Sequence, residues 1–223
     1  MAGMRHKVGL FGLMIAFLIT LSQAGCLIQP GKDPTSLSYD LATTVTVAAN
    51  EALPGTGIRY ETTDDEGAHL TIEGEKITKR KGDSVFWKGT LAPGVTADER
   101  FRVVWFTADN LTLAGTVKLH VDDVAPRALE PVTTSPVTFS GPEVYSLAKG
   151  AKIPGTQLVY EGSTDQGAQF SGIEGYAYRQ AGDSLVWEGM LRDGVYLRFE
   201  GRVIQFSSGS ARIAGIVTLW IGS

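Results

Sequence analysis

Hydrophobic and polar residues alternate along the chain in short runs, which Gly, Pro, Asn and Asp interrupt. From Leu37 onward no segment has the 3.6-residue periodicity of an amphipathic helix. Alternation with a period of two is typical of half-buried strands, so the sequence predicts an all-β fold of the sandwich type. In the first half of the chain we expect strands near 37–40, 43–49, 57–62, 68–73, 76–80, 84–91 and 100–107, with 113–121 as a candidate eighth.

A motif of ten residues occurs twice, at 82–91 and at 182–191, and reads Gly-Asp-Ser-x-x-Trp-x-Gly-x-Leu. The match extends to both sides at the same offset of 100 residues, with one slip of a single position near residue 72. Units of this length are tandem domains rather than solenoid turns, so we predict two β-sandwich repeats, over 37–121 and 137–223. Residues 122–136 contain three prolines, which predicts a stiff linker that holds two separate modules apart.

The alternation also assigns an inward face to each motif strand. Trp87 and Trp187 lie on that face, so we interpret both as core tryptophans. The pairs Gly82-Asp83 and Gly182-Asp183 are typical of tight turns, because glycine adopts positive φ and aspartate hydrogen-bonds to nearby backbone. A catalytic role for Asp83-Ser84 requires a general base, and none follows in either copy.

Each copy of the motif continues as Trp-x-Gly-x-Leu-x-x-Gly-Val, at 87–95 and 187–195, and leads into strands with alternating valine and phenylalanine. This pattern resembles the end of the Ig-like repeats that are common on prokaryotic cell surfaces. The resemblance implies tandem Ig-like sandwiches. The matched residues are structural in that family, so it implies no functional site.

The start of the chain has the composition of an export signal. Arg5 and Lys7 precede an apolar run over 8–21, which is short for a bilayer-spanning helix. Ala24-Gly25-Cys26 resembles the lipobox of bacterial lipoproteins. The resemblance implies a signal peptide over 1–25, cleavage before Cys26, and acylation of that cysteine as a membrane anchor. A secreted protein with a free thiol and an uncleaved signal anchor are the alternatives.

Three details bear on this anchor. Gln23 stands where lipoproteins prefer leucine, so the match is incomplete. Leu27, in place of the aspartate that resembles an inner-membrane retention signal, favours the outer membrane in a cell that has one. Residues 26–36 contain Pro30 and Pro34 and show no periodicity, which predicts a flexible tether between lipid and fold.

The charge and the cysteine count exclude several functions. The formal net charge is −4, and removal of a leader that carries Arg5 and Lys7 lowers it by two, to about −6. Such a chain repels phosphate backbones, so we expect no nucleic-acid partner. Cys26 is the only cysteine, which excludes an intramolecular disulfide and a cysteine-rich zinc site.

Candidate catalytic and metal-binding residues are few. His69 and His120 lie in different predicted strands without a visible triad or zinc site, and we interpret them as surface residues. Asp122-Asp123 at the joint between the repeats is a candidate Ca²⁺ site, although solvated turn acids explain it more simply. No carboxylate pair stands out as the site of a hydrolase.

Aromatic residues present in one copy alone offer candidate binding residues. Trp105 falls between Val104 and Phe106, which the alternation places inward, and Gln205 is its counterpart. Trp220, Tyr176 and Tyr178 are the others, where the first copy has no aromatic counterpart. Exposed aromatic side chains suit a protein partner or a sugar ring, and packing between the modules is the alternative.

Together these features predict a non-enzymatic, lipid-anchored, extracytoplasmic protein without a cofactor. We expect its two modules to bind an envelope protein or to stiffen an envelope complex. A surface glycan is the second candidate ligand, and an unrecognised hydrolase is the third interpretation.

Overall fold

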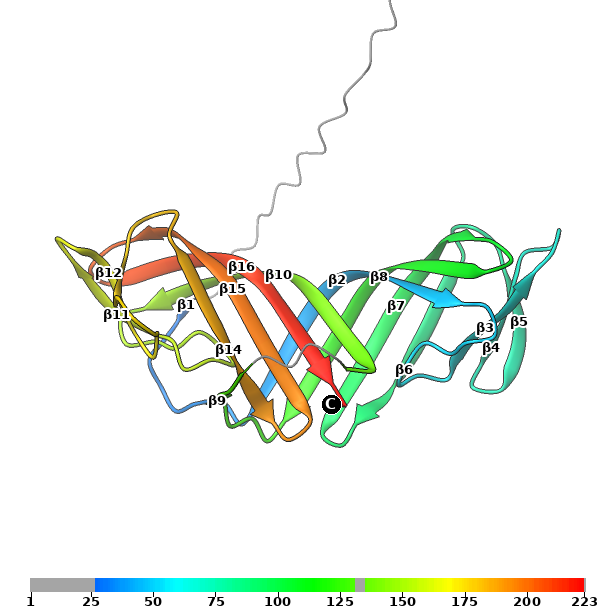
Figure 1. The fold of residues 1–223 in the computed structure, drawn as a ribbon, viewed down its shortest axis with the longest axis horizontal. Coiled ribbons are helices and arrows are strands. Elements are labelled where there is room, and N and C mark those ends of the chain that lie inside the picture. The colour runs from blue at the N-terminus through cyan, green and yellow to red at the C-terminus, as the bar shows by residue number, and fades with distance from the viewer. Residues whose placement is uncertain (1–26, 131–134, 223) are drawn as a thin grey trace, which may run out of the picture.

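The computed structural model describes residues 27–130 and 135–222. Every helix or strand found in these ranges is a β-strand (Figure 1), so the predicted all-β class is confirmed. Within the same ranges, no helix is long and apolar enough to cross a bilayer. The predicted signal peptide and Cys26 lie outside the described residues.

The first half of the chain forms two antiparallel sheets. The larger has the strand order β2-β8-β7-β6, and the smaller has the order β3-β4-β5. The strands of the larger sheet are β2 (Ser36–Ala48), β6 (Ser84–Ala92), β7 (Val95–Phe106) and β8 (Asn110–Asp122). Those of the smaller sheet are β3 (Ile58–Thr63), β4 (Ala68–Ile72) and β5 (Glu75–Lys79).

The second half has the same strand order, with two short strands added at the edges of its larger sheet. That sheet runs β1-β10-β16-β15-β14-β9, and the smaller one runs β11-β12-β13. The long strands are β10 (Val137–Ala148), β14 (Ser184–Arg192), β15 (Val195–Phe206) and β16 (Ser210–Ile221). The others are β1 (Leu27–Ile28), β9 (Arg127–Ala128), β11 (Val159–Thr164), β12 (Gly167–Ser171) and β13 (Tyr178–Arg179).

Most strands that are neighbours in a sheet are also neighbours along the chain. The exceptions are the edge strands β1 and β9 and one pair in each half. β2 pairs with β8, and β10 pairs with β16. Immunoglobulin domains instead distribute their strands by Greek-key connections. The strand order therefore differs from the one that the resemblance of the motif implies.

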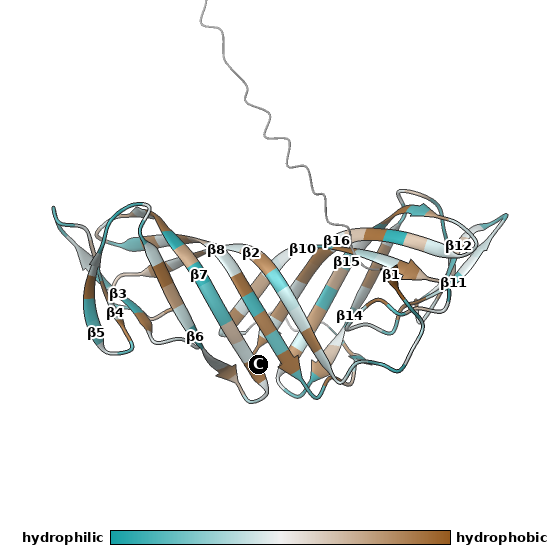
Figure 2. Ribbon diagram, turned by 180° about the vertical axis from the view of Figure 1, so that it is seen from behind, coloured by the Kyte–Doolittle hydropathy of each residue, from teal (hydrophilic) through white to brown (hydrophobic). Residues whose placement is uncertain are grey.

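One long strand spans two segments that the sequence predicts as separate strands. The predicted strands 37–40 and 43–49 form the single strand β2, because the residues between them contain no turn-forming glycine, proline or asparagine. Leu37, Leu41 and Val47 all face the same side of it and are buried. Figure 2 shows the alternation of hydrophobic and hydrophilic residues along β7 and β8 that this arrangement requires.

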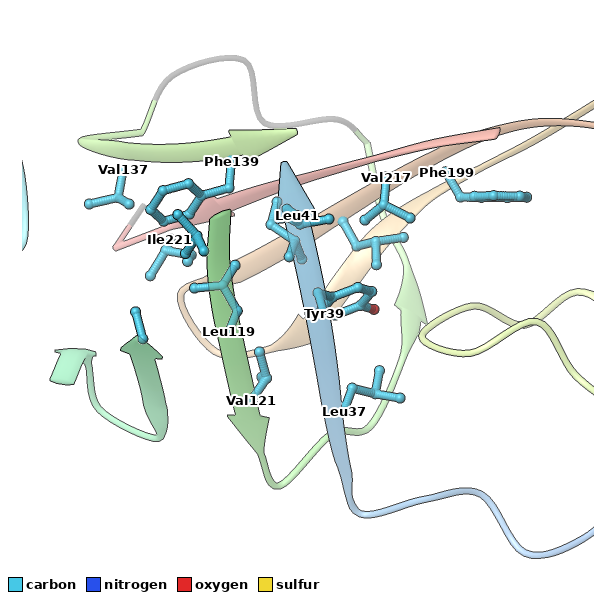
Figure 3. Close-up of a cluster of buried hydrophobic side chains, with 14 of the residues drawn as sticks. Leu37, Tyr39, Leu41, Leu119, Val121, Val137, Phe139, Phe199, Val217 and Ile221 are labelled. Atoms are coloured by element: carbon cyan, nitrogen blue, oxygen red, sulfur yellow. The ribbon is translucent and has the colours of Figure 1, made fainter. Parts of the chain in front are cut away.

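The two halves share one hydrophobic core, so the prediction of two modules held apart is wrong. Buried side chains of β2 and β8 pack against those of β10 and β16 (Figure 3). β2 and β10 approach closely at Gly141, where a Cβ would lie 3.0 Å from the side chain of Leu41. The residues at this centre are Leu37, Tyr39, Leu41, Leu119, Val121, Val137, Phe139, Val217 and Ile221.

A turn from each half also reaches the other half. Gly155 has a φ of +76°, and a Cβ there would lie 2.6 Å from the hydroxyl of Tyr39. Gly55, with a φ of +79°, approaches Val137 in the same manner, at 3.2 Å. Both positions require glycine for the backbone conformation and for the close contact, which explains why Pro-Gly-Thr recurs at 54–56 and 154–156.

The segments that the sequence assigns to tether and linker lie against the second half. Leu27 and Ile28 pair with β10 in parallel, and Asp33 forms an ion pair with Lys152 at 2.6 Å. Arg127 and Ala128 pair with β14. Residues 27–36 are therefore not a free tether, because an exposed edge of β10 offers its first residues backbone partners.

The shared core predicts that the two halves unfold together. Leu41→Ala should lower the free energy of unfolding by about 2–5 kcal/mol, because it leaves a cavity beside Gly141 between the halves. Urea unfolding, followed by tryptophan fluorescence and circular dichroism, should show one coincident transition that shifts as a whole. The exposed control Val104→Ala should change stability by less than about 0.5 kcal/mol. Two separate transitions, with only one shifted, would contradict the shared core.

Candidate functional site

The repeated motif forms structural elements in both halves. Trp87 and Trp187 are buried, 8% and 5% exposed. Gly82 and Gly182 have φ angles of +87° and +93°. The carboxylate of Asp83 accepts a hydrogen bond from the backbone N–H of Arg80 at 2.8 Å, as the turn interpretation requires. Asp183 accepts the equivalent bond from Gln180 at 2.7 Å.

The two buried indoles differ in their polar partners. Trp87 Nε1 donates to the carboxylate of Glu73 at 2.6 Å. Trp187 Nε1 is buried and has no hydrogen-bond partner among the described residues. A pocket of about 750 Å³ adjoins Trp187, and Glu130, Arg179 and Glu188 contribute to its wall. At the offset of 100 Glu73 corresponds to Ile173, and the nearest acid in the second half, Glu174, is displaced by one position.

Glu99 is a buried charge that the sequence interpretation missed. It lies on the inward face of β7 between Trp87 and Val117, and none of its surface is exposed. Neither carboxylate oxygen has a hydrogen-bond partner among the described residues, and burial raises the pKa of Glu99 to about 7. The alternation of β7 places residue 99 inward, and the offset of 100 pairs it with the buried Phe199. The inward position of residue 99 and its apolar counterpart in the second half are the two sequence features that identify Glu99 as a buried charge.

The four candidate binding aromatics lie in three separate places. Trp105 is 55% exposed on β7, and Tyr176 is 65% exposed before β13. Tyr178 is half-buried and packs on Tyr176, with ring centroids 5.5 Å apart. Trp220 is half-buried on β16, paired with strands on both sides. Of the four candidate residues, the structure thus brings only Tyr176 and Tyr178 together.

A β-bulge explains the position of Trp105. The register of β7 against β8 shifts between Val103 and Trp105, so both Val104 and Trp105 face outward. Val104 is 49% exposed, which corrects the inward assignment from simple alternation. The ammonium of Lys81 lies 3.3 Å from the centre of the Trp105 ring, a cation–π contact.

The histidines and the paired acids at 122–123 each contact another ionisable side chain. His69 Nε2 lies 2.8 Å from Asp64, and this hydrogen bond lowers the pKa of Asp64. His120 Nε2 lies 3.1 Å from Asp122. Arg192 lies 3.7 Å from the carboxylate of Asp123. Among the described residues no three His, Cys, Asp or Glu side chains gather as metal ligands, and calcium at Asp122-Asp123 stays a prediction.

An aromatic and cationic surface covers the outward face of β6 and β7. We define this surface, the β6–β7 face, by Lys81, Phe86, Lys88, Arg100 and Trp105. Phe86 is 61% exposed and sits opposite Arg100 in the register of the two strands. β6 is also the last strand of its sheet, so the face ends at an edge that no described strand covers. Exposed aromatic rings, cationic side chains and an open sheet edge coincide here, and Asp98 lies on the same face, opposite Lys88 and in an ion pair with Arg100 at 2.9 Å.

Comparisons of the chain with protein-family profiles, with curated proteins and with solved structures give no match. Function must therefore be argued from the geometry of the chain itself.

Glu99 predicts a specific dependence of stability on pH. Its pKa is about 7 in the folded protein and about 4.5 for an exposed carboxyl, so the folded state binds the proton more tightly. Protonation of Glu99 in the folded state therefore contributes to the free energy of unfolding. This contribution is fully present below pH 4.5 and is lost as the pH rises through 7, by about 3 kcal/mol in total. Glu99→Gln should remove this part of the loss between pH 5 and pH 8 in urea unfolding.

The matched control is Glu75→Gln, which changes an exposed residue of β5 and should leave the pH dependence as it is. An equal loss of stability in wild type and Glu99→Gln would show that Glu99 is not the titrating group.

Proposed function

We propose that the protein is a non-enzymatic, lipid-anchored binding protein of the cell envelope, which presents the β6–β7 face to a protein partner. The observation that carries the proposal is the exposure of Phe86 and Trp105, 61% and 55%, beside Lys81 and Lys88. Aromatic side chains are enriched in protein-binding surfaces, and the rim around them is polar and solvent-accessible. The corresponding positions in the second half hold Val186 and Gln205, so packing of the fold does not explain the aromatic residues.

The rigidity of the molecule supports a binding role for this face. β6 and β7 belong to a four-stranded sheet whose other side is anchored in the core shared by both halves. A partner that binds the outward side therefore meets a surface already ordered, which lowers the entropy lost on association.

The sequence supports the lipid anchor, and the position of β1 determines how close the folded part would lie to it. Ala24-Gly25-Cys26 resembles a lipobox, and β1 begins at Leu27, the next residue. An acylated Cys26 would hold the folded part directly at a membrane, and two or three acyl chains give durable attachment. Leu27, in place of a retention aspartate, favours transport to an outer membrane where the cell has one.

A carbohydrate ligand is the second candidate, and Tyr176 with Tyr178 favours it. Their rings lie 5.5 Å apart at a tilt of 53°, and Tyr176 is mostly exposed. A pair of this kind offers one accessible ring face to a sugar, with the second ring as support.

The anchor is tested by labelled palmitate. Incorporation should be lost completely in Cys26→Ala, because Cys26 is the only thiol in the chain, and the variant should leave the membrane fraction. Cys26→Ala that still fractionates with membranes would argue for an uncleaved signal anchor instead.

The partner is tested with a photo-reactive amino acid placed at Thr90 on the edge of β6, in cells that express the full chain. We expect one defined envelope protein to be crosslinked, and Phe86→Ala with Trp105→Ala to reduce the yield about tenfold. Tyr176→Ala, the matched control, should leave the yield unchanged. The converse result, together with binding on a glycan array that Tyr176→Ala abolishes, would favour the carbohydrate candidate.

A further inference from the structure

The two halves of the molecule differ at one corresponding sheet edge. In the second half β9 lies against the edge of β14, and Gly189, Met190 and Leu191 are buried. In the first half β6 is the terminal strand. Gly89 and Leu91 are half-buried there, and Thr90 is more exposed than its buried counterpart Met190. The same edge is therefore covered in one half and open in the other.

The covered edge shows how an extended segment is held at this position. β9 runs antiparallel to β14, with Ala128 opposite Gly189. The backbone N–H of Ala125 donates to the carbonyl oxygen of Leu191 at 2.7 Å. A Cβ on Gly189 would lie 2.3 Å from the carbonyl oxygen of Arg127, so glycine admits the close approach of the added strand.

The open edge keeps the same backbone and the same glycine. β6 pairs with β7 in the register that β14 has with β15, including the irregularity after Thr90 and Met190. The nearest atoms to a Cβ on Gly89 belong to the ring of Trp87 in its own strand, with no added strand in the place of β9 among the described residues. An open edge of this kind binds an extended peptide through main-chain hydrogen bonds.

The charge of the two edges is opposite in character. Lys88 stands in β6 where β14 has Glu188. Residues 75–92, which form β5, β6 and the turn between them, contain five cationic and two acidic residues. The corresponding residues 175–192 contain two of each. Asp98 on β7 stands opposite Lys88, but it forms an ion pair with Arg100 at 2.9 Å, so these two residues of β7 add no net charge. The open edge thus lies in a positive environment within a chain whose net charge is −4, which selects an acidic strand.

We propose that β6 accepts an extended acidic segment of a partner protein, which pairs antiparallel to it as β9 pairs with β14. This proposal rests on the proposed function and names the chemistry of its partner. The added strand extends the sheet beyond β6 and lies beside Phe86, which its side chains cover on the outward face. Lys88 and the cations at 80–81 pair with its carboxylates.

The test uses two labelled heptapeptides whose sequences derive from residues 124–130. The acidic probe is Val-Ala-Pro-Glu-Ala-Leu-Glu, and the basic probe is Val-Ala-Pro-Arg-Ala-Leu-Lys. We expect the chain over 27–223, which keeps every described residue, to bind the acidic probe at least about tenfold more tightly than the basic one in fluorescence anisotropy. Hydrogen exchange should slow in residues 88–91 and remain unchanged in residues 188–191.

Two variants make the test specific. Lys88→Glu should abolish or reverse the preference for the acidic probe. Lys118→Glu, an equal charge change on β8 of the same outward side, should alter the affinity less than about twofold. Equal affinity for both probes, or no slowing of exchange in residues 88–91, would overturn the proposal.

The remaining outcomes separate this proposal from the proposed function. If the crosslinked envelope protein is retained in full by Lys88→Glu, the strand proposal is wrong and the binding function stands. If no envelope protein is crosslinked but the acidic probe binds as expected, the edge accepts acidic strands and the envelope function is wrong. A dimer of the chain that Thr90→Pro abolishes would identify a second copy as the occupant and overturn the acidic partner.

Discussion

The contact between β2 and β10 is the constraint on which the rest of the structure depends. Neither of the two larger sheets is covered along its whole inner face by the small sheet of its own half, and the central part is covered by the other half. Gly141 permits this because its missing side chain leaves room for Leu41. Apolar surface buried in this way contributes about 25 cal/mol per Å², so separation of the halves would expose the inner faces of both sheets at once. The duplicated sequence thus folds as one body.

Once the halves are joined, their edges become unequal. The segment after β8 crosses to the second half and covers β14, and the segment before β2 covers part of β10. The first half receives no equivalent strand from the described residues. The difference between the two halves that matters for binding therefore arises from connectivity as well as from the aromatic residues that distinguish the copies.

Much of the fold follows from the sequence, because alternation is a direct consequence of strand geometry. The all-β class, the buried Trp87 and Trp187 and the turns before them could all be predicted. The outward position of Val104 could not, since a β-bulge depends on the register with β8. The packing of the two halves against each other could not be predicted from the sequence either. Proline-rich composition indicates stiffness, but it does not indicate whether the segment lies against a neighbour.

The position of β1 has a consequence for how the protein can search for a partner. A free spacer of ten residues would have an end-to-end distance of about 17 Å, and the body could turn in any direction above its anchor. Because Leu27 is already paired with β10, an acylated Cys26 would leave almost no flexible spacer between the lipid and the folded part. The molecule would then drift in the plane of the bilayer with a nearly constant tilt. Its encounters would be restricted to partners whose binding segments lie at one fixed height above the lipid.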